Sequence, residues 1–538
     1  MMRLKSTVCL ASLLIALSAS SVCAKSAPAP SARVQTDSGA VEGKRLDGGI
    51  TAYLGLPYAA PPVRDLRWRD PQPVPAWTGT YHADRLAPQC TQPQRNVLAN
   101  QYGGAEVTSE DCLYLNVWTR PALKKAPVIV YIHGGAFFIG SAGMPLYAGD
   151  SVARQGAVFV TLNYRLGALG FMAHPELSAE SPHKTSGNYG FLDQIAALRW
   201  VRRNIAKFGG DPENVTIVGQ SAGSMSVLAL QASPLAKGLF HRAVGMSGGL
   251  IGGPSDMPSL AVAEAEGVKL QNHFKAASLA QLRTLPADSI VVPRTPSGPK
   301  VGPVQDGHVL PKKIETIFAE GAQNDVPLLL GFTHDESFGG FGPISGLDDY
   351  RAKAAARFGT RAEAFLALYP AANDSEAKAQ ARAADRDSTM ASSMASWAEA
   401  QLQRGRKPVY TYQFSRAHSY APGVKFSDLD PATAGAYHTS EVPFWLGTLD
   451  SFNKYRTTRA WTPADRALSE KMTRALVAFA RTGRPAADGT RWPSYDPKSP
   501  MLMEFAVDQQ VAPWPDRRKF DFFRELARPN MATGALRD

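Results

Sequence analysis

The stretch that decides the fold of this 538-residue chain is Val215-Thr216-Ile217-Val218-Gly219-Gln220-Ser221-Ala222-Gly223. Residues 215–218 are β-branched and are typical of a buried strand. Residues 224–230 have the pattern of a helix. A serine between a strand and a helix lies on a tight turn that exposes its hydroxyl, and glycines flank it because side chains would not fit there. Ser221 is therefore predicted to be an exposed nucleophile.

Strand and helix patterns alternate around this turn. The apolar runs at 128–132 and 158–162 suit parallel strands that are covered on both faces. Residues 191–208 carry apolar side chains at spacings of three and four, which predicts an amphipathic helix ending at Gly209. This alternation favours a doubly wound, mostly parallel sheet with helices on both faces. Further strands are expected at 243–246, 326–331 and 409–414.

Two later segments are predicted to be helical. Residues 348–403 are rich in alanine and show no strand pattern, so we expect a helical insertion that forms part of a gorge wall. Residues 461–482 are expected to form a helix, because Pro463 lies near its start and Gly483 follows its end. No linker or internal repeat divides residues 34–525, which are expected to form one domain before a tail at 526–538.

The N-terminus has the pattern of a secretory signal peptide at 1–24, with basic residues before an apolar run at 8–17. Cleavage is expected after Ala24, and a lipid anchor on Cys23 is a disfavoured alternative. Residues 25–33 are expected to be a flexible segment. The mature protein is predicted to be secreted or periplasmic without a stable membrane anchor, because no other apolar run is long enough to span a bilayer.

Cysteine content and charge limit the classes of function. Cys90 and Cys112 remain after removal of the signal peptide, and such a pair in an exported chain predicts one disulfide, with two free thiols as the alternative. Their spacing resembles no zinc site, and neither a metal nor a cofactor is expected. The formal net charge is +11, but basic residues form no dense run. We therefore expect a solvated surface and no nucleic-acid partner.

A serine nucleophile needs a base that takes its proton and an acid that orients the base. In a fold of this kind the acid follows the serine at a strand end, and the histidine comes later in the chain. The strand at 326–331 is followed by Asp335 and Glu336, and both are candidates on this ground.

Three histidines follow at a suitable distance: His334, His418 and His438. His438 is favoured as the base because it lies in a loop directly before an apolar run. His418 lies among Ser, Ala and Pro and is expected to be an exposed loop residue.

The segment His133-Gly134-Gly135-Ala136-Phe137 directly follows the strand at 128–132. Its glycines supply backbone N–H groups without side chains, as an oxyanion hole requires. Gly134 and Gly135 are the candidate donors, with the N–H of Ala222 as the third. His133 is expected to pack beneath the loop and to take no part in the chemistry.

Several motifs together resemble the type-B carboxylesterase family, which includes acetylcholinesterase. They are SEDCLYLNV at 109–117, NYRLG at 163–167, the stretch at 53–69 and the serine turn itself. The resemblance extends over about 34–523. It implies an α/β-hydrolase fold with helical insertions around a gorge, and metal-free hydrolysis of small-molecule esters.

The resemblance also assigns roles to individual residues. It implies a triad of Ser221, Glu336 and His438, because the family uses the glutamate of an Asp-Glu pair as the acid. Ser247 resembles a serine that lies beside the triad histidine. Two structural features are implied as well: the Cys90–Cys112 disulfide and an ion pair between Glu110 and Arg165. The oligomeric state, monomer or dimer, is left open.

Two positions depart from the family pattern. Gln220 stands where a glutamate often precedes the nucleophile, and Tyr102 stands where cholinesterases have a tryptophan platform for a cation. Both changes weaken a cation site. We therefore expect a bacterial carboxylesterase of the para-nitrobenzyl esterase type that acts on small to bulky neutral or anionic esters. A lipase, an esterase for feruloyl or polycarboxylate esters, a protease or amidase, and a non-catalytic binding protein are the alternatives.

Overall fold

The computed structural model describes residues 32–527, except 106, 252–256, 292–297, 339 and 487–488. The predicted signal peptide at 1–24 therefore lies outside the described residues, as do most of the segment at 25–33 and nearly all of the tail at 526–538. Within the described part, no helix is both long enough and apolar enough to cross a membrane.

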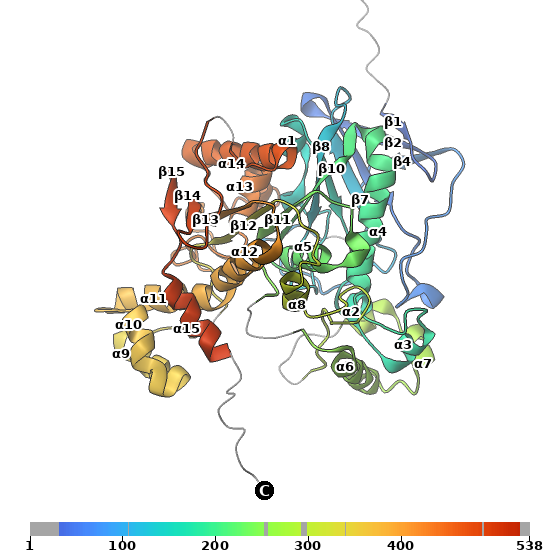
Figure 1. Ribbon diagram of the computed structural model, residues 1–538. Helices are drawn as coiled ribbons and strands as arrows, with labels where there is room; N and C mark the ends of the chain where they lie inside the picture. Colours follow the sequence, from blue (N-terminus) through green and yellow to red (C-terminus); the bar gives the residue numbers. More distant parts are fainter. Residues whose placement is uncertain are drawn as a thin grey trace, which may run out of the picture. The chain divides into compact units, whose positions relative to one another are not determined.

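A sheet of 13 strands has the order β1-β2-β3-β7-β9-β8-β10-β11-β12-β13-β14-β15, with β4 beside β2 (Figure 1). The strands are β1 (Arg33–Gln35), β2 (Ala40–Leu46), β3 (Ile50–Pro57), β4 (Thr80–Ala83), β7 (Tyr114–Thr119), β8 (Ala126–Ile132), β9 (Val158–Leu162), β10 (Gly210–Gln220), β11 (Arg242–Met246), β12 (Leu328–Thr333), β13 (Val409–Phe414), β14 (Met501–Phe505) and β15 (Gln509–Pro513). A separate two-stranded sheet pairs β5 (Gln89–Cys90) with β6 (Thr108–Ser109).

The predicted parallel arrangement holds at the centre of the sheet, where successive neighbours from β9 through β8 and β10 to β14 pair in parallel. Towards the edges, the pairs β1–β2, β2–β3, β3–β7, β7–β9 and β14–β15 are antiparallel, whereas β4 pairs with β2 in parallel. Short connections join β1 to β2, β2 to β3 and β14 to β15, and a tight turn can join only antiparallel neighbours.

Strand β8 shows why the central strands are continuously apolar. Val128, Val130 and Ile132 belong to one core cluster, whereas Ile129 and Tyr131 belong to the cluster on the opposite face. Alternate side chains of a strand point to opposite faces, so a sheet covered on both sides needs apolar residues at every position.

Helices cover both faces (Figure 1). One core cluster includes side chains of α4, α5 and α12, and the other includes side chains of α1, α13 and α14. The predicted helix at 191–208 is α4 followed by a 3-10 turn, and the predicted helix at 461–482 is α14, which Thr462 and Asp465 cap reciprocally. The helices named here are α1 (Asp150–Arg154), α4 (Tyr189–Asn204), α5 (Ala222–Ala232), α12 (Ser392–Arg404), α13 (Val442–Leu446) and α14 (Pro463–Thr482).

The predicted helical insertion consists of α9 (Leu347–Phe358), α10 (Ala362–Leu368), α11 (Asp374–Arg386) and α12. A π-helical turn at Asp387–Ala391 joins the end of α11 to the start of α12. The insertion has an aromatic core of its own, shared with α15 (Arg517–Ala527). A π-helical turn inside a helix often marks a functional region.

Candidate active site

Ser221 lies between β10 and α5 in a strained conformation, with φ 57° and ψ −124°. A Cβ atom on Gly219 would lie 2.1 Å from the carbonyl oxygen of Gly223. A Cβ on Gly223 would lie 2.0 Å from the carbonyl oxygen of Ile132. Strand, turn and helix therefore approach so closely that only glycine fits on either side of the serine.

Glu336 follows β12 and is buried. Its Oε1 accepts a hydrogen bond from the N–H of Thr333 at 3.1 Å, and its Oε2 lies 2.7 Å from Nδ1 of His438. Nδ1–H therefore donates to the carboxylate, which leaves Nε2 of His438 as the acceptor. That nitrogen lies 3.2 Å from the side-chain nitrogen of Gln220. The histidine is thus held in the tautomer that a general base requires.

Asp335 turns away from His438. Its Oδ2 accepts from the N–H of Ala436 at 2.8 Å, and its Oδ1 lies 3.0 Å from Nδ1 of His334. Burial alone would raise the pKa of Asp335, but the hydrogen bond from His334 helps to hold it below the ordinary value. Between the two acids that follow β12, the geometry therefore favours Glu336 as the partner of His438.

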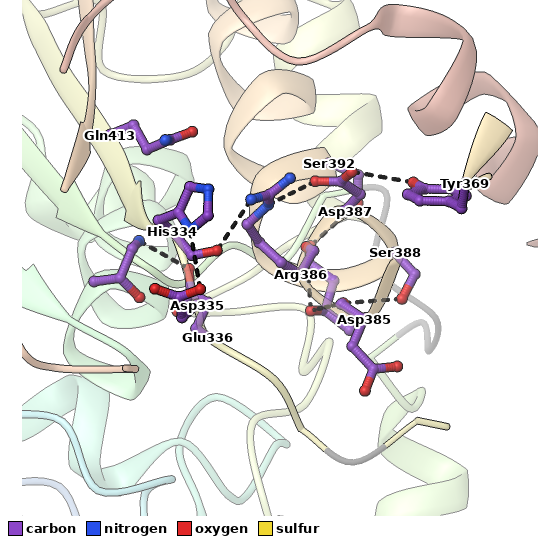
Figure 2. Close-up of polar contacts among 12 residues, drawn as sticks. His334, Asp335, Glu336, Tyr369, Asp385, Arg386, Asp387, Ser388, Ser392 and Gln413 are labelled. Atoms are coloured by element: carbon purple, nitrogen blue, oxygen red, sulfur yellow. Dashed lines mark hydrogen bonds and ion pairs between the residues drawn. The ribbon is translucent and has the colours of Figure 1, made fainter. Parts of the chain in front are cut away.

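A buried ion pair from the helical insertion supports the acid-bearing loop (Figure 2). Arg386 donates to the carbonyl oxygen of His334 at 3.0 Å and to the carboxylate of Asp387 at 2.7 Å. The hydroxyl of Tyr369 donates to the same carboxylate at 3.1 Å. No described residue of the insertion borders the catalytic cavity. Its polar side chains pack instead behind the loop of Glu336.

The glycine loop after β8 packs directly on the serine turn. A Cβ on Gly134 would lie 2.5 Å from the carbonyl oxygen of Gln220 and 3.1 Å from Cβ of Ser221. Gly135 has φ +107°, and a Cβ there would lie 1.9 Å from the carbonyl oxygen of Ile139. Ala222 is the first residue of α5, at the end of the helix dipole that attracts negative charge. The three candidate oxyanion donors thus lie on segments that meet at Ser221.

A cavity of about 520 Å³ opens above these groups. The side chain of Phe338 borders it and contacts the ring of His438 edge-on, at 4.9 Å between ring centroids. Among the described residues, no group of three or more His, Cys, Asp or Glu side chains could hold a metal ion. The bordering residues are Arg95, Asn96, Ala99, Asn100, Gln101, Gly134, Gly135, Ala136, Phe138, Ile139, Tyr147, Gln220, Ser221, Phe338, Asp428, Leu429, Tyr437, His438 and Thr439.

Tyr102 does not occupy the expected place of a cation platform. Among the described residues that border the catalytic cavity, its neighbour Gln101 is present and Tyr102 is not. Tyr102 borders a smaller adjacent cavity and packs against Tyr455, with ring centroids 5.7 Å apart. The loop geometry thus removes this ring from the site, whereas Gln220 lies where the sequence predicts it, beside the nucleophile.

Two histidines that the sequence singled out, His133 and His418, are buried. His133 stacks on Tyr164 at 4.4 Å beneath the glycine loop, as expected. The expectation that His418 is exposed is wrong: its Nε2–H donates to the carbonyl oxygen of Ser440 at 2.8 Å, and its Nδ1 accepts from Arg459 at 3.0 Å. Burial and then the charge of Arg459 lower the pKa of His418 to about 3. This ring therefore stays neutral and braces the loop of His438.

Ser247 donates its hydrogen bond to Glu441 at 3.3 Å instead of to the ring of His438. Sequence reasoning missed Glu441, although a carboxylate just before the apolar run at 442–446 was a visible signal. Burial, and next the charge of Glu336, raise the pKa of Glu441 to about 8. The carboxyl group of Glu441 is therefore uncharged at neutral pH.

The predicted disulfide is confirmed: Cys90 and Cys112 are bonded, with their Cα atoms 5.0 Å apart. It closes the loop that carries Arg95 and Gln101 to the cavity.

The predicted ion pair between Glu110 and Arg165 is wrong. Glu110 pairs with Arg67 at 2.5 Å, whereas Arg165 pairs with Asp193 on α4 at 2.7 Å. Each guanidinium meets both oxygens of its carboxylate, which is the geometry that Arg favours. The motif at 109–117 thus contributes Glu110 to one ion pair, and the motif at 163–167 contributes Arg165 to another.

Comparisons with known proteins agree with this geometry. Residues 30–523 match the model of the carboxylesterase family. The chain is 37% identical to a fumonisin B1 esterase from Sphingopyxis macrogoltabida over 480 residues, which cover 87% of this chain and 85% of that relative. It is 34% identical to a para-nitrobenzyl esterase from Bacillus subtilis (strain 168), with 90% and 97% of the two chains covered. A solved PNB esterase structure matches with a TM-score of 0.76 at 32% identity, covering 93% of this chain and 100% of that one. This chain therefore belongs to the carboxylesterase family and is a carboxylic ester hydrolase with the α/β-hydrolase fold.

Proposed function

We propose that this protein is an exported serine esterase that forms an acyl-enzyme on Ser221. The observation that carries the proposal is the 2.7 Å contact between Nδ1 of His438 and Glu336, beside a cavity that both Ser221 and His438 border. A serine on a strained turn, a base whose Nε2 is an acceptor and a buried acid behind it are the parts of a proton-transfer unit.

In the first half of the reaction, Nε2 of His438 takes the proton of Ser221 as Oγ attacks the ester carbonyl carbon. Glu336 stabilises the imidazolium through Nδ1–H. The carbonyl oxygen becomes an oxyanion, which the N–H groups of Gly134, Gly135 and Ala222 stabilise. The tetrahedral intermediate collapses, and the alcohol leaves with the proton from the histidine.

In the second half, water attacks the acyl-enzyme. His438 accepts a proton from this water and returns it to Oγ of Ser221, so that a carboxylic acid is released and the enzyme is restored. The proton that left with the alcohol is replaced by the proton from this water, so the protons balance over the cycle.

The substrates are proposed to be small to bulky esters that are neutral or anionic. A cavity of about 520 Å³ has room for more than a short acyl chain. Gln220 places a neutral amide beside the nucleophile. Export is proposed from the signal-peptide pattern and agrees with the disulfide, since disulfides persist in oxidising compartments. Sequencing of the secreted or periplasmic protein should find Lys25 at its N-terminus.

The triad is tested by hydrolysis of p-nitrophenyl butyrate. Ser221→Ala and His438→Ala should each lower kcat by several orders of magnitude, and the double variant by little more, because residues acting as one unit are not additive. Glu336→Gln should be severe but milder. Asp335→Asn is the matched control and should keep most activity. The acid is wrongly assigned if Asp335→Asn loses activity and Glu336→Gln keeps it.

The nucleophile is tested separately by labelling. An organophosphate should inactivate the enzyme and add to Ser221 in a peptide map, and EDTA should leave activity intact. An adduct on another serine would contradict the assignment.

A further inference from the structure

One wall of the catalytic cavity carries a positive charge. Arg95 is half-buried there, and its guanidinium donates a hydrogen bond to the carbonyl oxygen of Gln101 at 3.0 Å. In the part of the chain that the structure describes, no carboxylate lies within 4.0 Å of this guanidinium to form an ion pair. A guanidinium has five N–H donors in a planar fork, so donors remain for a bound anion.

The charge of Arg95 reaches the catalytic end of the cavity. Burial, and to a smaller extent Arg95, lower the pKa of His133 to about 4. Burial raises the pKa of Tyr147, and Arg95 opposes that rise. His133 lies beneath the oxyanion loop and Tyr147 borders the cavity. The cation therefore acts on the space in which the substrate must lie.

A second cation lies behind the same wall. Arg459 is only 2% exposed, and the rings of Tyr420, Phe426 and Phe452 lie 4.4, 5.1 and 4.5 Å from its guanidinium carbon. Its hydrogen bonds go to neutral groups: the side chains of His418, Asn100 and Tyr437 and the carbonyl oxygen of Thr458. Asn100 and Tyr437 both border the cavity.

A buried cation normally pairs with a carboxylate, because an unpaired charge is costly to remove from water. Among the described residues, Arg459 has no such partner within ion-pair distance. Cation–π contacts offset part of the cost. They do not cancel the positive charge, which lies directly behind Asn100 and Tyr437.

Negative charge in the cavity is limited. Asp428 is the carboxylate that borders it among the described residues, and it is exposed, with its Oδ1 accepting from the N–H of Asn100 at 2.8 Å. Beside the nucleophile, Gln220 is neutral. Glu336 lies behind His438 and is not among the residues that border the cavity.

We propose that Arg95 binds a carboxylate group of the substrate, so that esters bearing a free carboxylate in their acyl or alcohol part are the preferred substrate class. This proposal rests on the ester hydrolysis at Ser221 proposed above and adds the recognition group. A planar guanidinium fits a carboxylate with two parallel hydrogen bonds. A charged hydrogen bond of this kind corresponds to about 10- to 100-fold in kcat/KM.

The test compares esters that differ only in charge. For the acyl part, mono-p-nitrophenyl adipate is compared with p-nitrophenyl 6-oxoheptanoate, in which a methyl ketone replaces the carboxylate. For the alcohol part, 4-carboxybenzyl butyrate is compared with 4-acetylbenzyl butyrate. The wild-type enzyme should prefer the carboxylate ester by about 10-fold or more in kcat/KM in at least one pair. Added salt should reduce this preference.

Variants then locate the recognition group. Arg95→Gln should lower the carboxylate-to-neutral ratio of the preferred pair by about 10- to 100-fold, and Arg95→Lys should lower it less, because the charge remains. Arg120→Gln removes an exposed arginine elsewhere and should leave the ratio unchanged.

Two outcomes would overturn the proposal: wild-type ratios at or below one in both pairs, or an unchanged ratio in Arg95→Gln. Failure of the proposed function has a different signature. In that case the neutral esters would not be cleaved at all, or their cleavage would survive Ser221→Ala.

Discussion

Replacement of Glu441 by glutamine should change how the stability of the protein depends on pH. Glu441 is buried, Ser247 donates to its Oε1, and its Oε2 has no hydrogen-bond partner within the described residues. Burial, and then the charge of Glu336, raise its pKa in the folded state from 4.5 to about 8. Glutamine has the same shape and stays uncharged at every pH.

The sign follows from proton binding. Below pH 4.5 the carboxyl is protonated in both states, and Glu441 then imposes no ionisation cost on folding. Between pH 4.5 and about 8 the unfolded chain releases this proton and the folded chain retains it, so the free energy of unfolding falls by about 1.4 kcal/mol per pH unit. The loss is complete above the folded pKa and amounts to about 5 kcal/mol.

Urea unfolding of the wild type and Glu441→Gln at several pH values from 5 to 9 measures how much free energy of unfolding Glu441 costs at each pH. The advantage of the variant should grow with pH up to about 8 and then level off. Glu363→Gln removes an exposed carboxylate of α10 and should show no such trend. A difference between wild type and Glu441→Gln that is constant with pH would refute the reasoning, because Glu441 would then be charged in the folded protein.

Three further expectations concern stability and the oxyanion loop. Replacing both Cys90 and Cys112 by alanine should lower the free energy of unfolding by roughly 3 kcal/mol, with activity kept in the folded fraction; an equal urea midpoint would contradict this. Gly135→Ala should lower kcat by about 100-fold or more, since its Cβ would meet the carbonyl oxygen of Ile139 at 1.9 Å; unchanged turnover would exclude Gly135 from the oxyanion hole. Arg386→Met should cost about 3–5 kcal/mol of stability, because it leaves Asp387 buried without its cation. The double variant Arg386→Met/Asp387→Leu should recover much of that loss in urea unfolding, and a double variant as unstable as the single one would argue against the ion pair as the cause.

The features that local pattern encodes were predictable from the sequence. The central strands were predicted because a strand covered on both faces must be apolar at every position, as β8 is. The serine turn was predicted because its two glycines flank the serine in the sequence between a strand pattern and a helix pattern, and the structure shows that backbone atoms leave no room for a Cβ at either glycine. The order Ser221, Glu336, His438 was suggested by the fold and resolved between Asp335 and Glu336 only by the family resemblance.

The predictions that were wrong concern side chains whose partners are distant in sequence. The sequence neighbours of His418 are those of an exposed loop residue. In the structure, Arg459 and Tyr437 contact His418 and bury it, and the sequence around His418 does not indicate either partner. Arg165 finds Asp193 on a helix whose exposed face is also polar, so its partner could not be chosen by residue type. The sequence also does not predict in which direction a side chain points from an irregular loop. Tyr102 is an example, because it borders the adjacent cavity and not the catalytic cavity.

The Cys90–Cys112 bridge fixes both ends of the segment that carries Arg95 to the catalytic cavity, so this segment can be exchanged as a unit. The bond holds the two ends of the segment at a separation of 5.0 Å between Cα atoms, and five of the residues that border the cavity lie between them: Arg95, Asn96, Ala99, Asn100 and Gln101. Lengthening a closed loop costs little, about 0.6 kcal/mol for each doubling. A segment grafted from a relative between these cysteines could therefore redirect the choice of ester while the sheet and the triad stay in place.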